Sequence, residues 1–293
     1  MFFYILYRIG YFLANILPLR FAYGLANIVS DLQYFIAKQD REAVAENMST
    51  LLKKDVSECH ALSRKVFRNF GLYLVDFFRM PNLTKKDIDE RVKITGIENI
   101  QMVLGQNRGA VILTCHIGNW EMGGVVMAML GYDMSAVALN HKHKSINDFF
   151  IKQREKKGLK VITINFIMKR CISALRRKGL LALLGDRDFT NNGIIVNFFG
   201  IPTSIPKGPA MLSLKTNSAV IPGIFVREGR FNYNLIFDKP VEINEEADIS
   251  QEEVIKKATE RFVAIMEKYI RIYPDQWLIF RRFWETPTDA FVL

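Results

Sequence analysis

From about residue 90 onward, the hydrophobic positions follow two patterns in turn. Short apolar runs bounded by turn residues predict buried strands at 92–94, 110–114, 134–139, 160–164, 180–184 and 219–226. Apolar residues at helical spacing predict helices between them, at 97–106, 119–130, 145–157, 167–178 and 206–216. This alternation is typical of an α/β fold with a mostly parallel central sheet and helices on both faces.

Two further segments add to this core. Residues 194–199 and 231–237 have the pattern of extra strands, which we expect to be antiparallel, and residues 250–272 predict a long amphipathic helix. Residues 38–79 predict two amphipathic helices that precede the sheet.

Residues 1–36 are strongly apolar but interrupted by Arg8, Pro18 and Arg20. We expect two short helices joined at Pro18 that associate with a membrane, with the arginines reaching lipid head groups. A buried helical hairpin and a tilted spanning helix over 1–19 are the alternatives. The predicted organisation is a membrane-associating helical segment at 1–36 and an α/β domain at 37–293.

Composition narrows the class of partner. The chain has 293 residues and a formal net charge of +10, which favours an anionic partner. Basic and aromatic residues are not interleaved as in a nucleic-acid-binding module, so we expect a membrane surface or a lipid phosphate and no nucleic acid. The three cysteines have no metal or disulfide spacing and are expected to be core residues, Cys115 included.

His116 follows the predicted strand 110–114, and Glu121 lies one turn into the next helix. Ligands of open α/β sheets bind at the carboxyl ends of the strands. A neutral His there could remove a proton from a hydroxyl, and the Glu121 carboxylate could bind its other ring nitrogen. Backbone N–H groups near Gly118 to Trp120 could hold an oxyanion. A His that merely caps the helix is the alternative interpretation.

Charged residues near other strand ends could face the same pocket. Asp186, Arg187 and Asp188 follow the strand 180–184, where Arg187 could bind phosphate or pair with the aspartates. Lys207 lies near the start of a predicted helix, a place that suits an anionic group. The pair His141 and His143 lies in a lysine-rich loop, so we expect no metal site and no cofactor.

Taken together, the motifs resemble the bacterial lipid A secondary (lauroyl/myristoyl) acyltransferase family, part of the lysophospholipid acyltransferase superfamily. The segments that carry the resemblance are 17–20, 116–121, 185–188, 196–200, 206–210, 273–277 and 281–283. They run in register over nearly the whole chain.

The resemblance implies an enzyme of the bacterial inner membrane, with its site on the cytoplasmic side. It would move an acyl chain from acyl carrier protein or coenzyme A to a glycolipid hydroxyl. By this resemblance, His116 would be the base and Glu121 its partner. Asn119 and Arg154 would bind substrate. The site would also include Asp186, Arg187, Asp188 and Lys207.

Two departures from the family pattern concern the acceptor. Asn140 to His143 replace an arginine-containing segment, and the motif at 185–188 is shared with relatives that act on mannosylated phosphatidylinositol. The acceptor could therefore be a lipid A precursor or another glycolipid. A thioesterase or lipid hydrolase that activates water with His116, and a non-catalytic membrane-binding protein, are the rival hypotheses.

Overall fold

A seven-stranded sheet forms the centre of the protein in the computed structural model, which describes residues 2–141, 143–163, 166–189, 191–244 and 248–284. Its strand order is β1-β9-β8-β2-β5-β3-β4. The strands are β1 (Val92–Thr95), β2 (Ala110–Thr114), β3 (Met134–Val137), β4 (Lys160–Ile162), β5 (Leu180–Leu184), β8 (Ala219–Glu228) and β9 (Asn232–Phe237).

The sheet is mostly parallel, as the sequence predicts. Strands β8, β2, β5, β3 and β4 pair in parallel, β9 runs antiparallel to β8, and β1 pairs in parallel with β9. Every residue of β2 is buried, which explains its uninterrupted apolar run.

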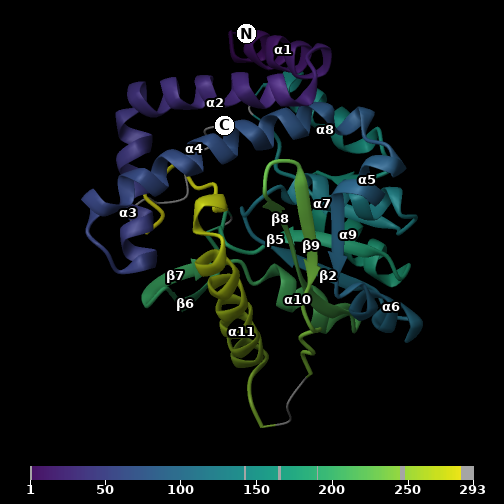
Figure 1. The fold of residues 1–293 in the computed structure, drawn as a ribbon. Helices are drawn as coiled ribbons and strands as arrows, with labels where there is room; N and C mark the ends of the chain where they lie inside the picture. Colours follow the sequence, from purple (N-terminus) through teal and green to yellow (C-terminus); the bar gives the residue numbers. More distant parts are fainter. Residues whose placement is uncertain (1, 142, 164–165, 190, 245–247, 285–293) are drawn as a thin grey trace.

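Helices cover both faces of this sheet, which confirms the predicted layers (Figure 1). Ala110 and Ile112 of β2 pack in one cluster with α6 (Ile97–Gly105), α7 (Trp120–Met129) and α8 (Lys144–Glu155). Val111 and Leu113 point to the other face. They pack with α9 (Ile167–Arg176), α10 (Gly208–Thr216) and α11 (Gln251–Ile272).

Two short elements differ from the expectation. Strand β6 (Ile194–Phe198) pairs with β7 (Ile201–Ile205) in a hairpin separate from the main sheet, and its turn residues Phe199 and Gly200 both have positive φ. Helix α5 (Lys85–Arg91) was not predicted. It begins with a reciprocal cap between Thr84 and Asp87, a signal in the residues themselves.

Helices α1 to α4 precede α5 and the sheet, and their breaks fall where the sequence indicates. Helix α1 (Phe2–Ile16) ends before Pro18 and α2 (Leu19–Ile36) begins after it. Helices α3 (Lys38–Leu52) and α4 (Val56–Arg79) follow, and two 3₁₀ turns cover Met80–Asn82 and Pro274–Gln276. Helices α1 and α2 form the outer layer above α4 (Figure 1).

A stripe of large apolar side chains on α1 and α2 is exposed. The stripe comprises Ile5, Leu6, Ile9, Phe12, Ile16, Phe21, Leu25, Ile28, Val29, Leu32, Phe35 and Ile36. The described part of each helix falls short of the length and apolar character that a bilayer crossing requires.

A buried ionic cluster fastens these helices to the sheet. Asp76 of α4 receives hydrogen bonds from Tyr23 of α2 at 2.5 Å and from Tyr233 of β9 at 2.8 Å, and it forms an ion pair with Arg227 of β8. The Arg227 guanidinium also lies 4.9 Å and 4.7 Å from the Tyr23 and Tyr233 ring centroids. Two helices and two strands therefore meet at one carboxylate.

We predict that Arg227→Met lowers the free energy of unfolding by about 3–5 kcal/mol, because it leaves the Asp76 charge buried without its partner. Urea unfolding followed by circular dichroism measures this change. Adding Asp76→Leu to the variant should restore much of the loss. A single variant as stable as the wild type would contradict the role given to this ion pair.

Candidate active site

The register of β2 against β5 places His116 beside Asp186. Thr114 pairs with Leu184 in the parallel ladder, and the next residues leave the two strands side by side at their carboxyl ends. The Gly185 N–H donates to the Thr114 carbonyl at 2.8 Å, which extends the pairing one step further. Strand pairing alone therefore brings together two polar residues that are far apart in the sequence.

The Asp186 carboxylate is completely buried and accepts three hydrogen bonds. Its Oδ1 lies 2.7 Å from His116 Nδ1, and its Oδ2 accepts from the His116 backbone N–H at 2.9 Å and from Trp277 Nε1 at 3.2 Å. Burial alone would raise the pKa of Asp186, but the charge of His116 and these donors outweigh it, so the pKa lies below its usual range.

An ionised carboxylate only accepts hydrogen bonds, so Nδ1 of His116 carries the proton and Nε2 is left as the basic nitrogen. The His116 ring meets the Trp120 ring edge-on at 5.0 Å, and Trp120 stacks on Tyr73 of α4 at 4.9 Å. These aromatic contacts fix the imidazole plane. The arrangement is that of a general base with its tautomer set by a carboxylate.

Glu121 does not hold His116, which corrects the expectation from spacing. Its carboxylate accepts from Nε and Nη2 of Arg154 on α8, at 2.8 Å and 2.5 Å, and no hydrogen bond joins it to His116 within the described ranges. Burial acts to lower the pKa of Arg154, but the Glu121 charge outweighs this and raises it. The two residues form a buried bidentate ion pair that joins α7 to α8.

The backbone at the start of α7 is also more constrained than expected. The N–H groups of Gly118 and Asn119 donate to the carbonyls of Gln276 and Phe225, each at 2.8 Å, so neither is free for an oxyanion. Gly118 has a φ of +61°, and an added Cβ would lie 2.0 Å from the Phe225 carbonyl oxygen. Only glycine fits this approach to β8.

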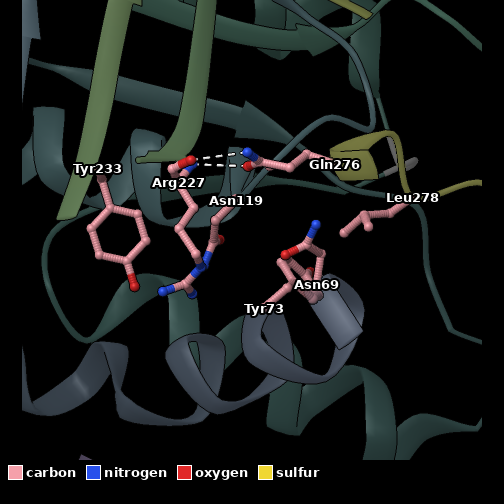
Figure 2. A pocket seen from close by; sticks show the side chains of 8 residues that line it. Asn69, Tyr73, Asn119, Arg227, Tyr233, Gln276 and Leu278 are labelled. Atoms are coloured by element: carbon pink, nitrogen blue, oxygen red, sulfur yellow. Dashed lines mark hydrogen bonds between the residues drawn. The ribbon is translucent and has the colours of Figure 1, made fainter. Parts of the chain in front are cut away.

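Asn119 caps α7 and lines a small polar pocket (Figure 2). Its Oδ1 accepts from the Met122 N–H at 3.0 Å, while its buried Nδ2 has no partner. Gln276 closes one side of the pocket with two hydrogen bonds to the Arg227 backbone, at 2.8 Å and 2.9 Å (Figure 2). Asn119 thus has a structural role, and its amide N–H could still bind a ligand.

The remaining charged candidates separate into two groups. Asp188 accepts from the Gly193 N–H at 2.7 Å and from Ser204 Oγ at 2.9 Å, so it shapes the loop before the β6–β7 hairpin. Lys207 Nζ donates to Asn192 Oδ1 at 2.8 Å on the surface. Nε of Arg187 has no hydrogen-bond partner among the described residues, and the guanidinium lies 4.6 Å from the Phe189 ring centroid.

Cys115 is fully buried, and burial raises the pKa of its thiol well above the usual value. It packs among core residues, as the alternation along the strand predicts, and is unsuited to act as a nucleophile. Across the described part of the chain, no cluster of His, Cys, Asp and Glu side chains could hold a metal ion.

A small apolar pocket lies between α7 and the sheet. Trp120, which contacts His116, is one of its walls. The other lining residues are Ile112, Thr114, Gly123, Gly124, Met127, Met134, Ala182, Gly223, Phe225, Leu235 and Phe237.

Sequence reasoning missed the contribution of the C-terminal segment. Trp277 reaches Asp186, and the Leu278 N–H donates to the His116 carbonyl at 2.8 Å. A short antiparallel bridge also joins Ile117 to Trp277. The resemblance drew attention to residues 273–277 as a motif, but only the folded chain shows that they close over the His116 loop.

Comparisons with known proteins point in one direction. The chain is 30% identical over 168 residues to a phosphatidylinositol mannoside acyltransferase of Mycobacterium tuberculosis, a match covering 55% of this chain and about half, 53%, of that protein. It is 26% identical over 221 residues to the protein of that name in Mycolicibacterium smegmatis, covering 74% of this chain and 72% of that one.

The lipid A biosynthesis palmitoleoyltransferase of Escherichia coli is 24% identical over 256 residues, a match covering 84% of this chain and 80% of that protein. The family model of the bacterial lipid A biosynthesis acyltransferases matches residues 1–286. That match covers almost the whole sequence and includes the segments around His116, Asp186 and Trp277. The chain therefore belongs to the bacterial lipid A biosynthesis acyltransferase family.

Proposed function

We propose that this protein transfers a fatty acyl chain from a thioester of acyl carrier protein or coenzyme A to a hydroxyl of a glycolipid. The observation that carries the proposal is the contact of His116 Nδ1 with the buried Asp186 carboxylate, at the carboxyl ends of β2 and β5. Family membership and the names of the relatives agree with acyl transfer.

In the proposed reaction, His116 Nε2 removes the proton of the acceptor hydroxyl as its oxygen attacks the thioester carbonyl carbon. A tetrahedral oxyanion forms, and it collapses as the carbon–sulfur bond breaks. The imidazolium then returns its proton to the leaving thiolate. Asp186 holds the ring in the reactive tautomer and stabilises the imidazolium between the two proton transfers.

We place the acyl chain along the small apolar pocket beneath α7, which would widen to admit it. It is walled by Trp120 on the His116 side and by Met127, Met134 and Phe237 among others, with Gly123 and Gly124 leaving room along the helix. The Glu121–Arg154 ion pair keeps the first turn of α7 against α8. We assign these two residues a positioning role, in which they preserve the shape of this pocket.

For the acceptor, we propose a phosphorylated glycolipid, either a lipid A precursor or a mannosylated phosphatidylinositol. The relatives carry names of both kinds. Hydrolysis of the thioester by water at the same base is the rival activity, and it needs no second substrate.

We further propose that the exposed apolar stripe of α1 and α2 rests in one leaflet of a membrane, with the site on the cytoplasmic face of the bacterial inner membrane. Helices α1 and α2 lie in the outer layer of the molecule (Figure 1), and twelve exposed large apolar side chains compose the stripe. A continuous exposed patch of this kind is uncommon on a monomeric soluble protein. A lipid surface would also suit the net charge of +10.

We predict that His116→Ala lowers the rate of acyl transfer about 100-fold or more, because the attacking hydroxyl loses its base. Purified wild type and variant would be supplied with an acyl carrier protein thioester and a lipid A precursor or a mannosylated phosphatidylinositol, and the acylated lipid would be quantified by mass spectrometry. Equal rates would exclude His116 as the base. Release of free fatty acid without acylated lipid would favour the hydrolase.

We predict that Asp186→Asn reduces kcat about 100- to 10,000-fold in protein that remains folded, because the amide permits the wrong tautomer of His116. Glu121→Gln is the matched control: it leaves the Asp186 contacts in place and should act through stability, with recovery in Glu121→Met/Arg154→Leu. Steady-state kinetics beside urea unfolding separates the two effects. A loss of kcat in Glu121→Gln but not in Asp186→Asn would show that Glu121, and not Asp186, orients the His116 ring.

We predict that Ile9→Glu/Ile28→Glu weakens binding to vesicles of anionic phospholipid at least about 10-fold, since each large apolar side chain that enters the lipid contributes about 1.5–3 kcal/mol. Met102→Glu/Ile195→Glu is the control, because it makes the same charge change at exposed apolar positions on α6 and β6. Sedimentation with vesicles measures the bound fraction. The same loss in both variants would show that charge alone is responsible.

A further inference from the structure

Two arginines beside the candidate base have buried N–H donors that nothing accepts. Nε of Arg187 and both Nε and Nη1 of Arg281 are inaccessible to solvent and have no hydrogen-bond partner among the residues that the structure describes. A buried donor without an acceptor destabilises the folded protein, and more so when the group is charged. These two side chains therefore carry unused hydrogen-bonding capacity.

Other arginines of the protein show what a completed pair looks like. Arg64 and Arg68 share the Asp31 carboxylate, Arg154 holds Glu121, and Arg227 holds Asp76. Even the neighbour of Arg281 in the chain, Arg282, forms an ion pair, with Glu46. Asp186 is the carboxylate that acts on both Arg187 and Arg281, and its oxygens already bind His116 and Trp277.

The Arg187 guanidinium and the Arg281 backbone are held in place by the surrounding structure. Arg187 directly follows Asp186, and its guanidinium stacks against Phe189. The backbone around Arg281 is clamped by the buried Asn47 of α3. Asn47 Nδ2 donates to the Arg281 carbonyl at 2.7 Å, and its Oδ1 accepts from the Phe283 N–H at 2.9 Å.

The two cations also repel one another. Burial and the nearby charge of Arg281 lower the pKa of Arg187 to about 10, and burial lowers the pKa of Arg281 as well. An anion between them would remove this repulsion and satisfy the vacant donors. Guanidinium groups match the oxygens of a phosphate in geometry and charge.

We propose that Arg187 and Arg281 together form a phosphate-binding subsite beside His116. The phosphate comes either from the phosphopantetheine arm of the acyl donor or from the head group of the lipid acceptor. This inference rests on the proposed acyl transfer for the identity of the phosphate, whereas the anion site itself does not depend on it. By fixing a charged group next to Asp186, the subsite aligns one substrate with His116.

The first experiment measures binding without turnover. Inorganic pyrophosphate is titrated calorimetrically into wild type, Arg187→Gln, Arg281→Gln and the control Arg282→Gln, each checked for folding by circular dichroism. We expect both subsite variants to bind at least about 10-fold more weakly, because charge-assisted hydrogen bonds are lost, and the control to match the wild type. Absence of binding to the wild type, or equal binding by all four proteins, would overturn the proposal.

The second experiment identifies the source of the phosphate by kinetics. A donor site predicts that the variants raise KM about 10-fold for an acyl-coenzyme A thioester, and leave it unchanged for the phosphate-free thioester of N-acetylcysteamine. An acceptor site predicts the corresponding contrast between a phosphorylated glycolipid and its dephosphorylated form. A loss that is the same with and without phosphate would refute the subsite.

Arg187→Lys and Arg281→Lys provide a further comparison, since they keep the charge and should recover part of the affinity for pyrophosphate. A wild-type protein that binds pyrophosphate through this pair but transfers no acyl group would leave the anion site standing and refute the proposed function. Acyl transfer that proceeds equally well without either arginine would support the proposed function and refute the phosphate subsite.

Discussion

The buried carboxylate of Asp186 is the interaction on which this site depends. It joins the end of β5 to the loop after β2 through two hydrogen bonds, and to the C-terminal segment through a third. A carboxylate taken wholly out of water is stable only when its oxygens are bonded. The same contacts that make its burial possible also set the orientation of His116, so structure and proposed chemistry share one group.

Three clusters of buried charge lie in this part of the protein, and one of them differs from the other two. Glu121 and Arg154 neutralise one another between α7 and α8, and Asp76 gathers helices and strands on the other side of α4. Both are complete pairs, typical of structural roles. Arg187 and Arg281 are the exception, since their donors point to no acceptor. This incomplete charge cluster beside two complete ones is the feature on which the proposed phosphate subsite rests.

The sequence predicted the sheet, its helices and the strand ends that carry His116 and Asp186, because period and turn residues are local signals. It predicted the wrong carboxylate for His116. Glu121 is close along the chain, whereas Asp186 is close through the register of β2 against β5, which a sequence pattern does not determine. The unpaired state of Arg281 could not be foreseen either, because it depends on which carboxylates the fold brings near.

The position of Trp277 has a consequence for the order in which the protein matures. Trp277 lies 91 residues beyond Asp186 in the chain, so a ribosome adding about 5–20 residues per second produces it roughly 5 to 20 s later. Helices α1 and α2 precede Trp277 in the chain, so both are synthesised before the contacts that fasten the His116 loop can form. Under the proposed membrane association and acyl transfer, a growing chain would reach a lipid surface before its imidazole is correctly oriented, so membrane binding would precede reactivity.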